Sequence, residues 1–162
     1  MSTDSSGRPS EVSAMMALAL AEAGAAPGHG DVPVGAVAVH GGRVVASRHN
    51  ERELRGDPTE HAELLALAEA AAVLGTWRLS GLTLFVTLEP CPMCAGALVA
   101  SRADRVVFGA ADPKAGACGS LYNLCADPRL NHEVEVVPGV QAGEASSLLT
   151  RFFDGRRHPR AG

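Results

Sequence analysis

Residues 82–94 read LTLFVTLEPCPMC, an apolar run that leads directly into two prolines and two cysteines. The apolar stretch Leu82–Leu88 predicts a buried strand. A helix is expected to begin near Pro92, because proline is favoured in the first helical turn, and to run to about Ala100. A buried strand followed at once by a helix is typical of α/β proteins.

The segments on either side continue this alternation. Strands separated by helices favour a sheet that is covered on both faces. Asp57, Pro58 and Glu60 match a helix start, with Asp57 as the cap and Glu60 closing a capping box. The predicted elements are a helix over 12–25, a hairpin of Val34–His40 and Arg43–Ser47 around Gly41-Gly42, a helix from Asp57 to about Leu74, strand cores at Arg105–Phe108 and Glu133–Val137, and a last helix with an apolar face at Ala145, Leu148, Leu149, Phe152 and Phe153.

The composition fits one compact domain. The chain has 162 residues, of which 46% are hydrophobic and 20% charged, so it can bury a core without disulfides. No apolar run is long enough for a membrane span, and the polar N-terminus lacks the apolar centre of a signal peptide. We therefore expect a cytoplasmic protein with no membrane partner, in which residues 1–10 form a disordered extension, 11–157 a single domain and 158–162 a tail.

The charge is unevenly distributed along the chain. The formal net charge is −4, but residues 151–162 carry four arginines against one aspartate, which leaves −7 on the other 150 residues. A basic tail on an acidic body can bind phosphate locally. A solvated chain terminus would give the same pattern.

Two of the four cysteines have metal-ligand spacing. Cys91 and Cys94 lie three residues apart at the expected helix start, where they project to the same side. The positive end of a helix favours thiolates, and two thiolates at this spacing suit zinc. By itself the pair fits a redox couple, half of a structural zinc site or part of a catalytic one. Cys118 and Cys125 are further apart than in a zinc knuckle, and we expect them to fill the core.

A histidine and a glutamate favour the catalytic alternative. A catalytic zinc has three protein ligands and an open position for water, and His61 with the two cysteines supplies three. Glu63 would then accept the proton of the water rather than bind the metal. Residues two apart on a helix point to nearly opposite sides. Both side chains therefore reach one site only if the start of this helix, rather than its flank, forms the wall of the pocket.

The H-x-E at 61–63 with the downstream P-C-x-x-C resembles the signature of the cytidine deaminase-like zinc deaminases. Within that superfamily the chain is similar to the bacterial tRNA-specific adenosine deaminases over about residues 12–157. The runs that carry the similarity are DVPVGAV at 31–37, DPT at 57–59, VTLEPC at 86–91, CAGAL at 94–98, VVFGA at 106–110, GSL at 119–121 and NH at 131–132.

The resemblance implies an α/β fold, a three-layer α/β/α sandwich around a five-stranded mixed sheet. It implies one Zn²⁺ per subunit, a homodimer in which both subunits shape the RNA site, and a tRNA anticodon stem-loop as the partner. The expected reaction is hydrolysis of adenosine to inosine at the wobble position, because a base in a single-stranded loop is easily unstacked. Ala111 and Arg151 depart from the residues of many relatives, which affects RNA contacts and not the chemistry.

The resemblance also assigns roles to individual residues. His61, Cys91 and Cys94 would bind zinc, and Glu63 would move protons. Asn50 would hydrogen-bond the flipped base. The residues expected to contact the rest of the RNA are Asp112 and Lys114, near the sugar and backbone, and Phe152, Phe153, Arg156 and Arg157, on the last helix.

Three other functions fit parts of the pattern. A free-base deaminase acting on cytosine or guanine shares the zinc motifs and needs no basic tail. A non-catalytic zinc-stabilised RNA-binding module predicts a fourth protein ligand and no release of ammonia. A thiol redox protein predicts a reversible disulfide between Cys91 and Cys94. The last two functions have no need for both His61 and Glu63.

Overall fold

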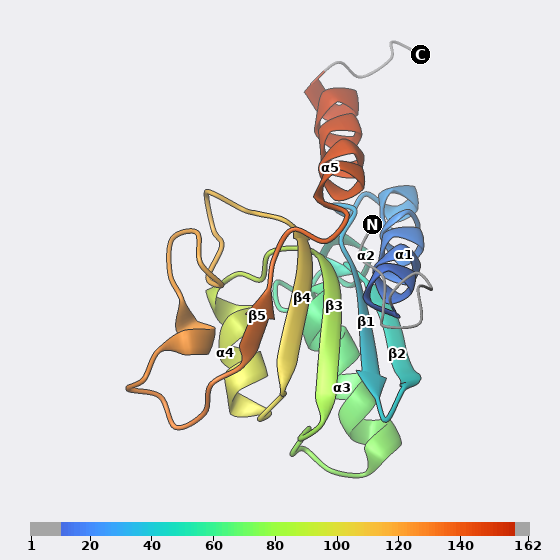
Figure 1. Ribbon diagram of the computed structural model, residues 1–162. Helices are drawn as coiled ribbons and strands as arrows, with labels where there is room; N and C mark the ends of the chain where they lie inside the picture. The colour runs from blue at the N-terminus through green and yellow to red at the C-terminus, as the bar shows by residue number, and fades with distance from the viewer. Residues whose placement is uncertain (1–10, 158–162) are drawn as a thin grey trace.

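The computed structural model describes residues 11–157, and five strands within them form one mixed sheet in the order β2-β1-β3-β4-β5 (Figure 1). Strand β1 is antiparallel to β2 and β3, whereas β3, β4 and β5 are parallel to one another. The strands are β1 (Gly35–His40), β2 (Arg43–His49), β3 (Leu82–Leu88), β4 (Arg105–Ala110) and β5 (Glu135–Val137). The predicted five-stranded mixed sheet is confirmed. The extension predicted at 1–10 and the tail at 158–162 lie outside the described residues.

Helices cover both faces of this sheet (Figure 1). Helix α1 packs on one face, and α3 and α4 pack on the other, which confirms the three-layer sandwich. Along residues 11–157, no helix has the length and apolar character that crossing a bilayer requires. The helices are α1 (Glu11–Ala23), α2 (Arg52–Arg55), α3 (Ala62–Leu74), α4 (Pro92–Ala100) and α5 (Ala142–Arg157), with short 3-10 turns η1 (Pro27–His29) and η2 (Leu124–Ala126).

The alternation of side chains along the strands separates the core into two layers. In β1, Val37 faces α1 and belongs to a cluster with Met16 and Phe85. Its neighbours Ala36 and Ala38 point to the opposite face and join the larger cluster under α3 and α4. Because successive strand residues point to opposite faces, one apolar strand supplies both layers.

Helix α3 begins at Ala62 and not at Asp57, so the predicted capping box was wrong. Asp57 instead accepts hydrogen bonds from the N–H and the hydroxyl of Thr59, at 2.8 and 2.7 Å, and forms a tight turn. The N–H of Ala62 is satisfied by Oδ1 of Asn50 at 2.9 Å. The cap therefore comes from the end of β2 and not from the residues just before the helix. The short helix α2 between β2 and α3 was not predicted.

Helix α1 approaches β1 so closely that Gly35 has no room for a side chain. A Cβ at this position would lie 2.0 Å from the carbonyl oxygen of Ala19 and 2.6 Å from the backbone nitrogen of Ala23. Both atoms belong to the helix backbone, which cannot rotate away as a side chain can. The distance between helix and sheet thus depends on glycine at this position.

Gly35→Ala is expected to lower the free energy of unfolding by about 3 kcal/mol, at the upper end of the cost of overpacking, because the helix must shift. Urea unfolding followed by circular dichroism measures the change. Gly28→Ala is the control, since a Cβ there meets nothing within 4 Å. Equal stability of the two variants would contradict the close approach of α1 to β1.

Candidate active site

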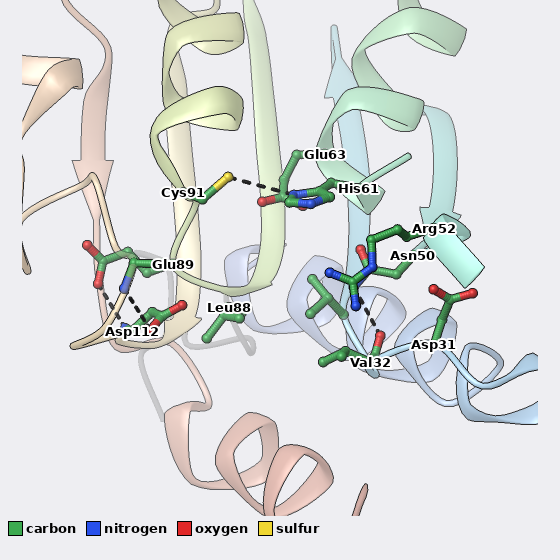
Figure 2. Close-up of a pocket in the computed structure, with 12 residues that line it drawn as sticks. Asp31, Val32, Asn50, Arg52, His61, Glu63, Leu88, Glu89, Cys91 and Asp112 are labelled. Atoms are coloured by element: carbon green, nitrogen blue, oxygen red, sulfur yellow. Dashed lines mark hydrogen bonds between the residues drawn. The ribbon is translucent and has the colours of Figure 1, made fainter. Parts of the chain in front are cut away.

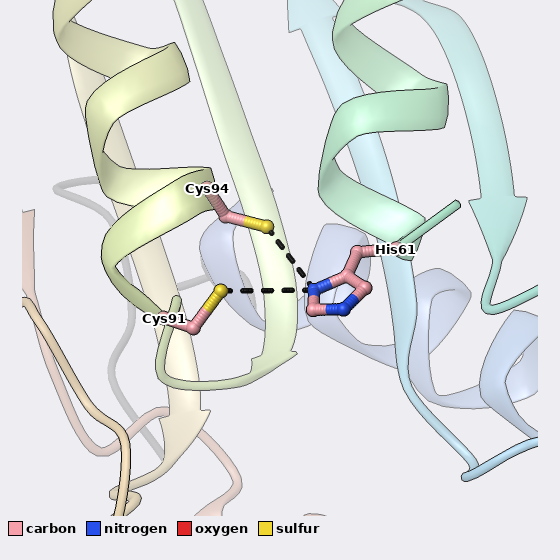
Figure 3. Close-up of side chains that lie close together, drawn as sticks. All are labelled: His61, Cys91 and Cys94. Atoms are coloured by element: carbon pink, nitrogen blue, oxygen red, sulfur yellow. Dashed lines mark hydrogen bonds between the residues drawn. The ribbon is translucent and has the colours of Figure 1, made fainter. Parts of the chain in front are cut away.

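Two helices start side by side, and each carries a predicted metal ligand at its cap (Figure 3). His61 is the N-cap residue of α3 and Cys91 that of α4, while Cys94 lies in the first turn of α4. Both cap residues have extended backbone conformations, which turns their side chains away from the helical path. Figure 3 shows the three side chains pointing toward one another across the gap between the helices.

The distances in this cluster fit a tetrahedral metal. His61 Nδ1 lies 3.5 Å from Cys94 Sγ and 3.7 Å from Cys91 Sγ, and all three ligand atoms lie within 4.8 Å of one another. Tetrahedral zinc, with bonds of about 2.0 Å to nitrogen and about 2.3 Å to sulfur, separates these atoms by about 3.6 Å. Within the described part of the chain, this is the only such group of three. Cys118 and Cys125 lie buried in the core, with their sulfurs 3.8 Å apart.

The cluster favours a thiolate at Cys91. Hydrogen bonding to Cys94 lowers the pKa of Cys91 to about 4, against the effect of burial, and His61 adds to the lowering. Hydrogen bonding to Cys91 and burial both raise the pKa of Cys94. Hydrogen bonding to Cys91 raises the pKa of His61, although burial and the charge of Arg52 act in the opposite direction. The thiolate is the form of cysteine that binds metals.

Glu63 lies beside the cluster. Its side chain is buried, and it lines the same pocket as His61. Burial raises the pKa of the Glu63 carboxyl, which brings its proton affinity closer to that required for proton transfer near neutral pH. As the spacing required, the start of α3 rather than its flank presents both side chains to the site.

The cluster opens into a pocket (Figure 2). The structure brings five of the residues singled out from the sequence to its wall: Asn50, His61, Glu63, Cys91 and Asp112. Cys94 is fully buried and does not line the pocket. The lining residues that sequence analysis missed are Asp31, Val32, Val34, Arg52, Leu88, Glu89 and Ala115.

The other predicted RNA contacts do not line the pocket. Lys114 is exposed on the loop after β4. Phe153, Arg156 and Arg157 lie on α5, which projects beyond the end of the sheet (Figure 1). Phe153 is 42% exposed, and the guanidinium of Arg156 lies 5.3 Å from the centre of the Phe152 ring. The side chains of Phe152, Phe153 and Arg156 thus lie together on α5, away from the pocket wall.

Asn50 joins the end of β2 to the start of α3. Its Nδ2 donates a hydrogen bond to the carbonyl of Val32 at 3.1 Å, and its Oδ1 accepts the N–H of Ala62. A carboxamide has two N–H donors and two acceptor positions. One donor and one acceptor position are therefore left for a molecule in the pocket.

Glu89 holds the wall of the pocket that lies opposite Asn50 (Figure 2). Its buried carboxylate accepts the backbone N–H groups of Asp112, Cys118 and Ser120, each at 3.0 Å, and the hydroxyl of Ser120. Burial raises the pKa of Glu89, but these hydrogen bonds outweigh it and hold the pKa below its ordinary value. The one feature of the sequence that could have identified Glu89 as a site residue is its position directly before Pro90-Cys91. The loop after β4, and with it Asp112, depends on this carboxylate for its position.

Glu89→Gln is expected to lower the free energy of unfolding by about 1.5–3 kcal/mol, because an amide nitrogen replaces an acceptor and hydrogen bonds to a charge are lost. Urea unfolding at neutral pH gives the value, and hydrogen exchange should show loss of protection at residues 112–120. Glu135→Gln, at an exposed glutamate of β5, is the control and should change neither. Unchanged protection in Glu89→Gln would contradict the role of this carboxylate.

Comparisons with known proteins agree with this geometry. The family model of the MafB19-like deaminases matches residues 10–157. The chain is 53% identical to a tRNA-specific adenosine deaminase of Bacillus subtilis over 85% of this chain and 86% of the relative. It is similar to a solved structure from studies of A-to-I editing by tRNA:A34 deaminases at the wobble position, with a TM-score of 0.81, 41% identity, and coverage of 84% and 99% of the two chains. A guanine deaminase from Nitrosomonas europaea is similar with a TM-score of 0.76 but 25% identity, over 86% and 83% of the chains.

Proposed function

The chain belongs to the MafB19-like deaminases and, among them, to the tRNA-specific adenosine deaminases, and we propose that it hydrolyses adenosine to inosine at the wobble position of a tRNA anticodon. The observation that carries this function is the His61–Cys91–Cys94 cluster beside the buried carboxyl of Glu63 in one pocket. The identity to the adenosine deaminase is about twice that to the guanine deaminase, which favours RNA over a free base as substrate.

His61, Cys91 and Cys94 would hold one Zn²⁺ per subunit, since their spacing suits a tetrahedral ion and two thiolates balance its charge. When bound, the metal supplies Lewis-acid activation of water near neutral pH. Glu63 takes a proton from the attacking water, whose oxygen adds to C6 of adenine. Glu63 delivers this proton to the ring nitrogen N1, then takes the proton of the new hydroxyl on C6 and passes it to the amine. The C6–N bond breaks as the C6=O bond forms, and inosine and ammonia are released.

The pocket residues would position the nucleotide. Asn50 would hydrogen-bond the base through its remaining donor and acceptor, and Asp112 would lie near the sugar. Because an adenosine can enter such a pocket only when it is unstacked, a single-stranded anticodon loop is a suitable substrate. Outside the pocket, the RNA contacts proposed from the family resemblance are Lys114, Phe153, Arg156 and Arg157.

The family resemblance also supports three statements about the whole protein. Residues 11–157 would form a single deaminase domain, in agreement with the extent of the family match. The protein would act as a homodimer in which both subunits shape the RNA site. Its location would be the cytoplasm, where tRNA is the partner.

The zinc-loaded protein is expected to form inosine in an anticodon stem-loop with adenosine at the wobble position, and to leave free cytosine and guanine unchanged. Nuclease digestion followed by chromatography and mass spectrometry quantifies inosine, and released ammonia gives an independent measure. A stem-loop with adenosine at a stem position is the control substrate, since a stacked base is protected. Turnover of guanine or cytosine without turnover of the stem-loop would favour the free-base deaminase instead.

Glu63→Ala should abolish turnover while leaving one zinc per subunit, because Glu63 moves protons and is not a ligand. His61→Ala should lose both zinc and activity. Metal content measured by plasma mass spectrometry, on variants with circular dichroism like that of the wild type, separates the two effects. Loss of zinc in stoichiometric amount from Glu63→Ala would make Glu63 a ligand and contradict the proposed role.

A further inference from the structure

Arg52 is the one lysine or arginine among the described residues that line the pocket. Its charged neighbours on the wall, apart from His61 and Cys91 of the metal-ligand cluster, are four acids: Asp31, Glu63, Glu89 and Asp112. Figure 2 shows Arg52 on the same side of the pocket as Asn50, Val32 and Asp31, opposite Asp112 and Glu89. A cation at the wall of a binding pocket is available to a ligand where the protein itself does not pair it firmly.

The acids around the pocket do not provide that partner. Asp31 accepts two backbone N–H groups of α2, and Asp112 accepts two from the loop after β4. Glu89 accepts four hydrogen bonds from its own loop. Glu63 is buried beside the metal-ligand cluster. Both oxygens of Asp31 and of Glu89, and Oδ1 of Asp112, are thus used to hold the chain in place.

The neighbouring arginines are paired, whereas Arg52 is not firmly held. Arg48 and Arg55 both bind the buried carboxylate of Glu51. Arg52 contacts Glu53 at 3.4 Å, and both of these side chains are about half exposed. An exposed ion pair between adjacent residues contributes little to stability. The guanidinium of Arg52 therefore keeps donors free for a ligand.

The backbone that carries Arg52 is nevertheless well fixed. The carboxylate of Asp31 receives the N–H groups of Glu53 and Leu54 at 2.8 and 3.1 Å. At the other end of α2, Gly56 adopts the left-handed conformation that closes the helix, with its N–H donating to the carbonyl of Arg52. A guanidinium with free donors on a fixed backbone is suited to binding, because the backbone loses little conformational entropy when a ligand binds.

We propose that Arg52 binds a phosphodiester of the RNA next to the target nucleotide. This inference rests on the proposed function, because a base that enters the pocket brings its flanking phosphates to the pocket rim. The planar guanidinium presents paired N–H donors that match two phosphate oxygens. Asp112 would then approach the sugar from one side, while Arg52 holds the backbone from the other.

Methylphosphonate substitution provides the test, because it removes the charge of one phosphate at a time. Binding of a series of anticodon stem-loops, each with one neutral linkage, is measured for the wild type and for Arg52→Gln at several salt concentrations. With the unmodified stem-loop, we expect Arg52→Gln to bind about tenfold more weakly at low salt, and the slope of log K against log salt to fall by about 0.7. At one linkage beside the target adenosine, neutralisation should weaken the wild type and have no further effect on Arg52→Gln.

Arg55→Gln is the matched control, since it removes the same charge from the same helix. It should show full sensitivity to neutralisation at that linkage, and Arg52→Lys should restore the salt slope with only part of the affinity. Additive effects of Arg52→Gln and neutralisation at every linkage would overturn the inference. Because binding is measured without turnover, a wild type that binds the stem-loop but forms no inosine would overturn the proposed function alone.

Discussion

The rest of the site depends on the close approach of two helix N-termini, those of α3 and α4. Both helices pack on the same face of the sheet, and their cap residues His61 and Cys91 meet across the gap. Two positive helix ends this close repel each other unless negative charge lies near them. A thiolate at Cys91 supplies that charge. Negative charge at Cys91 would therefore favour the packing of the two helices as well as the binding of a cation.

Much of the fold could be predicted because the signals for it are local. Apolar runs and the Gly41-Gly42 turn predicted the five strands. Strong helix formers predicted α1, capping and proline signals predicted helices at α3 and α4, and apolar periodicity predicted α5. The predicted start of α3 was wrong because the first N–H of the helix is capped by Asn50, twelve residues earlier. A local sequence pattern contains no signal for a cap that comes from a distant residue. The same reason explains why the short helix α2 was missed, since its first N–H groups are held by Asp31.

The candidate site likewise contains residues that could be predicted from local sequence and residues that could not. The ligand cluster was predictable because the spacing of C-x-x-C and H-x-E reflects the geometry that a metal demands. Glu89 and Arg52 were not, because a single acid or base in a loop is usually a solvated charge. What makes Glu89 structural is a set of backbone N–H groups from a loop more than twenty residues away. What distinguishes Arg52 is that Arg48 and Arg55 bind the buried carboxylate of Glu51, whereas Arg52 contacts only the half-exposed Glu53.

A net charge of −4 by itself disfavours RNA as a substrate, but net charge is a poor measure of the field at a binding site. At physiological ionic strength, charges beyond about 8 Å are largely screened. Near the pocket, the carboxylates of Asp31 and Glu89 face backbone N–H dipoles that offset part of their charge. The groups left to act on an approaching phosphate are those without a protein partner of comparable strength. A protein with a net negative charge can therefore still offer a cationic side chain to a phosphate, provided that the nearby carboxylates are hydrogen-bonded by its own backbone.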